Sequence, residues 1–317
     1  MTKARGWTLA CAVLALAGCG SNNPAPTDAG MVVDTDGGAT GTDAGSTPTL
    51  PVASVMGGGA PDFSCLGTRT APAAGAEIAV TAAFTEAVSG STLPNGTSVD
   101  IFRSNIISET CAAPDCTTVT ANAMGEVMAM LPASAWFAYR VAGSTATTSS
   151  APVTTIGYNR GAPAAAGSAG QSYISRQTIG LIPGLFGRMR VPGTTIVSGA
   201  IYDCADQPIA GAIARVFRDG TEILSGTGAM DPFAGYFAGA TPSMRARNTD
   251  AMAGRFAFAN IDVTPDPVRV ELWAVRTEGA APERIACEEV QPAADAVVII
   301  TELPLRADYA AGSGCGS

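Results

Sequence analysis

Segments of strand length with an apolar–polar period of two run through most of this chain, and they constrain its fold more than any other feature. Turns rich in proline and glycine separate them, and no long helical period follows the first 18 residues. This alternation is typical of half-buried β-strands. The chain is therefore predicted to be all-β. The expected strands are 77–84, 98–103, 126–131, 195–202, 214–218, 255–258, 268–273 and 296–300.

The order of these strands repeats. Each copy has a strand, a Pro/Gly turn, a second strand that ends in Phe-Arg, a polar glycine turn and a third strand. The copies span 52–159 and 194–306, which predicts two tandem β-sandwich domains with those bounds. Residues 307–317 are expected to form a C-terminal tail.

The segment 160–193, between the copies, is predicted to be an interdomain linker. Its run 161–170 holds only Gly, Ala, Pro and Ser, a composition typical of flexible linkers. A glycine-broken apolar stretch follows. Its large side chains either pack against one sandwich and fix the interdomain angle, or form an exposed patch that contacts a partner. They are Leu181, Ile182, Leu185 and Phe186.

Three stretches of the second copy, 197–208, 209–212 and 249–256, together form one pattern. It consists of a strand with an Asp, a Gly/Pro turn, a Gly-Ala pair and a Thr-Asp hairpin that ends in Phe. The pattern resembles the carboxypeptidase regulatory-like domain, with one extra residue before Gly254. The resemblance implies transthyretin-like or immunoglobulin-like sandwiches, which serve as spacers, adhesive modules or carbohydrate-contacting modules. No peptidase domain accompanies them here.

The amino end has the layout of a secretory signal. Lys3 and Arg5 precede the apolar run 7–16, and small residues follow it. The alternative is a transmembrane helix, but a membrane span needs about 20 apolar residues and this run has ten. Residues 1–18 are therefore predicted to be a signal peptide.

The four residues that end the signal, Leu16-Ala17-Gly18-Cys19, resemble the lipobox of bacterial lipoproteins. The resemblance implies that Cys19 is lipidated and becomes the first mature residue, so that the membrane is a partner through a lipid anchor. By the same resemblance, the residue after Cys19, Gly20, which is not acidic, implies the outer membrane or cell surface. Cleavage without lipidation is the alternative. Residues 19–51, which are rich in Gly, Thr, Asp and Pro, are predicted to form a disordered acidic linker.

Six cysteines remain after Cys11 and Cys19, and an even number in an exported chain indicates disulfides. They are Cys65, Cys111, Cys116, Cys204, Cys287 and Cys315. Cys204 with Cys287, Cys111 with Cys116 and Cys65 with Cys315 are the pairs we expect. A zinc site is not predicted, because the chain has neither a Cys-x-x-Cys motif nor a histidine.

Missing residue types exclude most catalytic sites. The chain has no histidine, and Lys3 is its one lysine, so catalytic triads with histidine, phosphate-loop lysines and Schiff bases are excluded. Glu288 and Glu289 are adjacent on a predicted strand, so they face opposite sides and cannot act on one substrate. We predict no enzymatic activity, no catalytic residue, no cofactor and no metal. The net charge of −9 argues against nucleic acid as a partner.

Two aromatic residues are candidates for ligand contact. Trp136 is expected to face away from its strand neighbours Phe137 and Tyr139, and Tyr236 lies in a predicted loop between 220 and 248. Either could stack on a sugar, and the alternatives are a covered sheet edge for Trp136 and a packed loop for Tyr236. The prediction is a non-enzymatic surface lipoprotein with a structural or protein-interaction role, and the alternative is a carbohydrate-binding one.

Overall fold

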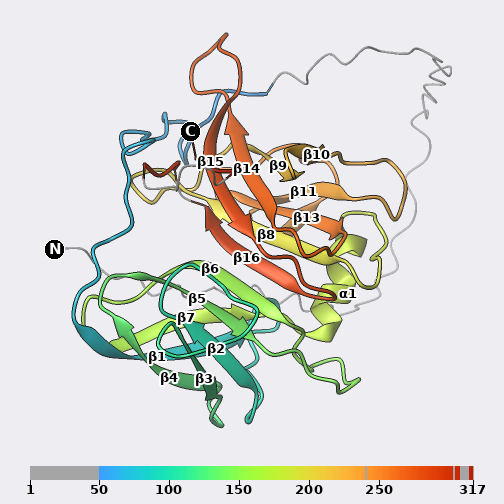
Figure 1. Ribbon diagram of the computed structural model, residues 1–317. Helices are drawn as coiled ribbons and strands as arrows, with labels where there is room; N and C mark the ends of the chain where they lie inside the picture. The colour runs from blue at the N-terminus through green and yellow to red at the C-terminus, as the bar shows by residue number, and fades with distance from the viewer. Residues whose placement is uncertain (1–49, 240, 303, 308–313, 317) are drawn as a thin grey trace, which may run out of the picture. The chain divides into compact units, whose positions relative to one another are not determined.

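A nine-stranded mixed sheet joins both halves of the chain, and two smaller sheets pack against it (Figure 1). The computed structural model describes residues 50–239, 241–302, 304–307 and 314–316. The expected signal peptide 1–18, Cys19 and the linker as far as residue 49 lie outside the described residues.

The strands lie close to where the period of two placed them, and the prediction of an all-β fold is confirmed. From one edge to the other, the nine-stranded sheet contains β12 (Thr241–Ser243), β11 (Phe233–Ala238), β13 (Arg255–Ile261), β8 (Thr195–Ile201), β16 (Val297–Glu302), β6 (Thr155–Gly161), β5 (Trp136–Val141), β2 (Ser98–Phe102) and β3 (Cys116–Thr120). The three-stranded sheet contains β4 (Glu126–Pro132), β1 (Glu77–Glu86) and β7 (Gly167–Tyr173). The four-stranded sheet contains β10 (Thr221–Ile223), β9 (Ile213–Arg218), β14 (Val268–Ala274) and β15 (Glu283–Val290).

The two expected sandwiches share a sheet instead of following one another as separate layers. β16, from the second copy, lies between β6 of the first copy and β8 of the second, and it pairs with both in parallel. A backbone ladder therefore runs without a break from one sandwich into the other.

The two smaller sheets cover opposite faces of the shared sheet. Val298 and Ile300 of β16 belong to the core under the four-stranded sheet, whereas Val297 lies in a second core with the helix α1 (Arg176–Leu185). Successive strand residues face opposite sides. Gly157 of β6 pairs with Ile299 and lies under the ring of Tyr139, which belongs to the core under the three-stranded sheet. The helix and the three-stranded sheet thus share one face, called the α1 face below.

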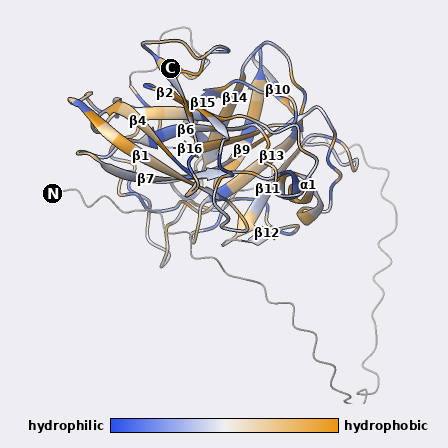
Figure 2. Ribbon diagram, turned by 90° about the horizontal axis from the view of Figure 1, so that it is seen from below, coloured by the Kyte–Doolittle hydropathy of each residue, from blue (hydrophilic) through white to orange (hydrophobic). Residues whose placement is uncertain are grey.

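Alternate burial along the strands explains why the layers pack. In β4, Val127, Ala129 and Leu131 face the core, whereas Met128 and Met130 are exposed. Hydrophobic colouring along β1 and β4 in Figure 2 shows how apolar these strands are. Apolar burial of this kind contributes about 25 cal/mol per Å².

The linker predicted for 160–193 is wrong in the structure. Its first two residues end β6, and Gly167–Tyr173 forms β7, which pairs in parallel with β1 and makes an edge of the three-stranded sheet. The backbone makes the ladder hydrogen bonds, so Gly and Ala suffice where few side chains need to pack. Its apolar part forms α1, in which Leu181 and Leu185 are about half exposed at 49% and 50%.

The end of α1 is fixed by an aromatic cluster. Phe186 directly follows the helix and contacts Phe233 and Phe237 of β11 edge to face, with centroid separations of 5.9 and 5.5 Å. Gly235 lies between those two strand residues, and a Cβ there would be 2.7 Å from the Phe186 ring. The missing side chain therefore makes room for the ring.

Within the described residues, no helix has the length and apolar character of a membrane span.

A buried carboxylate holds the start of α1. Glu86 ends β1 and is 3% exposed, and its oxygens accept hydrogen bonds from the backbone N–H groups of Val88, Ser89 and Ser175, the helix N-cap. Burial raises the pKa of Glu86, but these bonds and one from Thr178 outweigh it, so that the pKa lies below its ordinary value of 4.5. The ionised form is therefore favoured by folding.

We expect the free energy of unfolding to fall less steeply at acidic pH in Glu86→Gln than in the parent chain. Because the folded pKa is the lower one, Glu86 stabilises the fold fully above the unfolded pKa, and this contribution is lost as the pH falls through the folded value. Urea unfolding between about pH 5 and pH 3 should show a smaller loss of stability in Glu86→Gln than in the parent chain. The exposed Glu109→Gln is the control. Equal slopes in the parent and Glu86→Gln would contradict the assignment.

The six cysteines form three disulfides, and two of the expected pairings are wrong. Cys204 bonds to Cys65 and not to Cys287, and Cys315 bonds to Cys287 and not to Cys65. Cys287 belongs to the four-stranded sheet and Cys204 follows β8 of the shared sheet, so flanking one sequence unit did not bring them together. The third bond, Cys111–Cys116, is the expected one.

Candidate functional site

Four residues from neighbouring strands form a row across the α1 face of the shared sheet. Arg255 of β13 pairs with Ala200 of β8, and Ala200 pairs with Thr301 of β16. On the next strand, Arg160 of β6 donates a hydrogen bond to the Thr301 hydroxyl at 3.4 Å. The row thus has an arginine at each end and two small side chains between them. Three strand spacings put the two arginine Cα atoms about 14 Å apart.

A β-bulge turns Arg160 toward this face. Tyr158 lies in the core under the four-stranded sheet, and Asn159 adopts a left-handed φ of 55°. The register with β5 shifts here, so that Gly157 pairs with Tyr139 but Arg160 pairs with Phe137. Arg160 therefore lies on the side of Phe137, the α1 face. Re-aiming one side chain is a usual effect of a bulge.

The two guanidiniums differ in their partners. Arg160 donates through Nε to Gln171 Oε1 at 2.7 Å. Arg255 is half-buried, and within the described residues it has neither an ion pair nor a hydrogen bond. Burial raises the pKa of the Tyr202 phenol, while the charges of Arg255 and Arg160 act to lower it and that of Asp206 acts to raise it. Both arginines line the same cavity, from the two ends of the row.

A cavity of about 220 Å³ begins at this row and runs along the shared sheet toward α1. It is called the sheet–helix cavity below. Ser198, Val297 and Ile299 form its floor. One wall is α1, through Ile182 and Leu185, and Ile174, which directly precedes the helix N-cap, also lines the cavity. The cavity is therefore apolar along its length and cationic at one end.

The structure does not bring the two predicted contact residues into this cavity. Tyr236 is a correction, because it lies on β11 and not in a loop. It is 5% exposed in the core, and its hydroxyl accepts a hydrogen bond from the Ala214 N–H at 3.0 Å. Aromatic residues alternate on both faces of β11 and both faces are covered, so Tyr236 cannot stack on a sugar.

Trp136 opens β5 and is half-buried. Two guanidiniums lie over its indole, that of Arg306 4.5 Å and that of Arg69 5.5 Å from the ring centroid. Cation–π contacts of this kind stabilise by about 0.5–1 kcal/mol at exposed sites. The ring thus binds the segments that precede β1 and follow β16.

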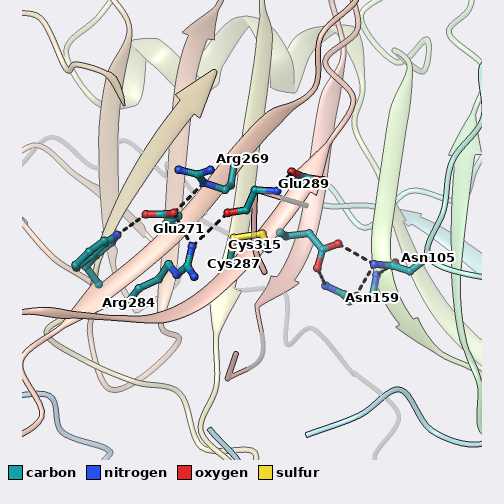
Figure 3. Close-up of a disulfide and its surroundings, with 11 residues drawn as sticks. Asn105, Asn159, Arg269, Glu271, Arg284, Cys287, Glu289 and Cys315 are labelled. Carbon is teal, nitrogen blue, oxygen red and sulfur yellow. Dashed lines mark hydrogen bonds and ion pairs between the residues drawn. A yellow bond between two sulfur atoms is a disulfide. The ribbon is translucent and has the colours of Figure 1, made fainter. Parts of the chain in front are cut away.

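Figure 3 shows the charged surroundings of the Cys287–Cys315 disulfide. Glu271 is 3% exposed, lies 2.8 Å from Arg269 and 3.1 Å from Arg284, and accepts a hydrogen bond from Trp273 Nε1 at 2.8 Å. Both oxygens of Glu271 thus have a cation or a donor. These contacts make the cluster a structural network.

The adjacent glutamates of β15 do point to opposite faces. Glu289 accepts a hydrogen bond from the Gly314 N–H at 2.6 Å, beside the disulfide. Glu288 is 6% exposed and lies on the inner side, where Asn105 and Asn159 donate side-chain hydrogen bonds to it at 3.0 and 2.8 Å (Figure 3). Glu288 therefore holds the bulge that aims Arg160.

A scan against protein-family models finds no match, and neither does a search of the curated proteins. Among solved structures the chain is similar to GBS52, the minor pilin of Streptococcus agalactiae, with 9% identity, a TM-score of 0.20 and coverage of 74% of this chain and 99% of that chain. The chain is also similar to a variant of BcpA, the major pilin subunit of Bacillus cereus, with 10% identity, a TM-score of 0.21 and coverage of 71% of this chain and 70% of that chain.

The Bacillus anthracis TIE protein is also similar, with 9% identity, a TM-score of 0.20 and coverage of 72% of this chain. This chain spans 34% of the length of that protein. TM-scores this low do not establish a common fold. The fold assignment therefore rests on the strand pairing described above.

Proposed function

We propose that this chain is an exported, lipid-anchored protein of the bacterial outer membrane or cell surface, whose β-sandwich body has a binding or structural role and no enzymatic activity. The observation that carries the proposal is Leu16-Ala17-Gly18-Cys19 after a short apolar run. In this proposal Cys19 bears the acyl chains, and residues 19–51 tether the body to the membrane.

Two further observations support export and a non-enzymatic role. All six cysteines of the described body are in disulfides, which form and persist in oxidising compartments. The residue types that most catalytic sites use are missing, since the chain has no histidine and its one lysine is Lys3. The strand–turn pattern of 197–256 suits a carboxypeptidase regulatory-like module with a spacer or contact role.

Cys19→Ser is expected to move the protein from the membrane fraction to the soluble fraction. The substitution removes the sulfur that would carry a lipid, and the folded body itself should not change. Fractionation and labelling with radioactive palmitate measure the effect. Cys11→Ser is the matched control, because Cys11 lies inside the apolar run and should leave with the signal. Membrane retention and labelling of the Cys19→Ser chain would contradict the lipid anchor.

A further inference from the structure

We propose that the sheet–helix cavity is a binding site for a small amphiphilic carboxylate, meaning a carboxylate that carries a short acyl chain or a single aromatic ring. Of the residues of this site, only Ile182 and Leu185 were singled out in the sequence, as part of an apolar segment, and the inference goes beyond the proposed anchoring and display role. It rests on the charge at one end of the cavity, on the apolar character of the rest and on the volume.

The charge identifies the head group. Arg160 and Arg255 flank the small residues Ala200 and Thr301, and within the described residues neither arginine has a carboxylate partner. A partly buried guanidinium without a counter-ion is costly and attracts an anion. The planar fork of arginine matches a carboxylate in two parallel hydrogen bonds. The Thr301 hydroxyl lies beside the same place.

The apolar floor identifies the tail. From Thr301 the floor continues along β16 over Ile299 to Val297, a distance of about 13 Å for four strand residues. Ile182 of α1 and Ile174 line the sides. A hydrocarbon chain or ring that extends from the carboxylate would meet mostly apolar surface there, with the hydroxyls of Ser172, Thr178 and Ser198 at the lining, and its burial is favourable by about 25 cal/mol per Å².

The volume limits the size of the ligand. An apolar cavity of about 150 Å³ in another protein accommodates benzene, and sites for drug-sized ligands measure about 300–1,000 Å³. At about 220 Å³, the sheet–helix cavity fits a ligand between these classes. A fatty acid of medium length or an aromatic acid with one ring meets both the volume and the charge.

Isothermal titration calorimetry tests the proposal on the full chain with Cys19→Ser, exported so that the disulfides form. Octanoate is the probe, and octan-1-ol is its uncharged counterpart. We expect octanoate to bind at least about tenfold more tightly than octan-1-ol, because hydrogen bonds to charged groups are worth that much. Arg255→Gln should lower the affinity for octanoate about tenfold and leave that for octan-1-ol unchanged.

Two further variants distinguish a loss of the binding site from a general loss of positive charge and from unfolding. Arg245→Gln removes an exposed arginine outside the cavity lining and should leave the binding of octanoate unchanged. Ala200→Leu adds a side chain to the floor and should abolish the binding of both probes, with the circular dichroism spectrum and the melting curve retained.

Several results would overturn the proposal. These are no octanoate binding by the folded parent chain, equal binding of octanoate and octan-1-ol, or an equal loss in Arg245→Gln and Arg255→Gln. A dimer that Leu185→Glu dissociates, with no probe bound, would show that a second copy covers the cavity instead. None of these results depends on whether Cys19 is acylated, so the anchor and the ligand site succeed or fail separately.

Discussion

Replacing both Cys65 and Cys204 with serine is expected to lower the free energy of unfolding by about 4–5 kcal/mol, the largest effect of any disulfide in this protein. The two cysteines are 139 residues apart in sequence, so their bond removes much conformational entropy from the unfolded chain. It also fixes the segment before β1 to the turn after β8, where Cys204 donates its backbone N–H to the Asp62 carbonyl at 2.8 Å.

Chemical denaturation of the double variant under oxidising conditions measures this loss. The matched control is Cys111→Ser with Cys116→Ser, where the two cysteines are only five positions apart in sequence and the expected loss is about 2 kcal/mol. Replacing both members of each pair avoids a free thiol that could exchange with the remaining bonds. Equal losses in the two double variants would show that loop length does not set the stabilisation.

Glu288→Ala is expected to cost about 3 kcal/mol of unfolding free energy. The carboxylate is buried, and its removal leaves one N–H of Asn105 and one of Asn159 without an acceptor, at about 1–3 kcal/mol each. Its neighbour supplies the control. Glu289→Ala removes the same group from the outer face of the same strand, where Gly314 is half-exposed, and should cost less than 1 kcal/mol, roughly one ordinary hydrogen bond.

Thermal and urea unfolding of the two single variants give the comparison. Glu288→Ala should also weaken octanoate binding if it still folds, because Asn159 would lose the contact that holds the bulge before Arg160. A loss no greater than that of Glu289→Ala would mean that the asparagines find other partners and that the buried carboxylate is not needed to hold the bulge.

The sequence predicts strands well here because apolar alternation records burial directly. In β13, Phe256 and Phe258 face one side, and Arg255, Ala257 and Ala259 face the other. The large residues correctly predict a core. The small residues leave room on the α1 face. Their spacing indicates a surface that another element covers, or a cavity. One strand alone does not show which element covers that surface.

The errors concern long-range pairing. The run 161–170 looks like a linker because its side chains are small, yet from Gly167 onward the β1 backbone supplies hydrogen bonds to it. The spacing of cysteines along the chain does not show which strands become neighbours. It therefore could not predict that Cys65 bonds to Cys204, which follows β8 of the shared sheet. The site arginines are 95 residues apart in sequence, and only the strand order and the bulge at Asn159 bring them to one row.

The place of β16 has a consequence for biogenesis. β6 and β8 both pair with it, so both expose a bare edge until this late segment has been synthesised and delivered. A polypeptide threaded through an export channel amino end first could not complete either layer on the way. We expect its maturation to wait for the carboxyl end, with a holding chaperone on the far side of the membrane shielding the unpaired edges until then.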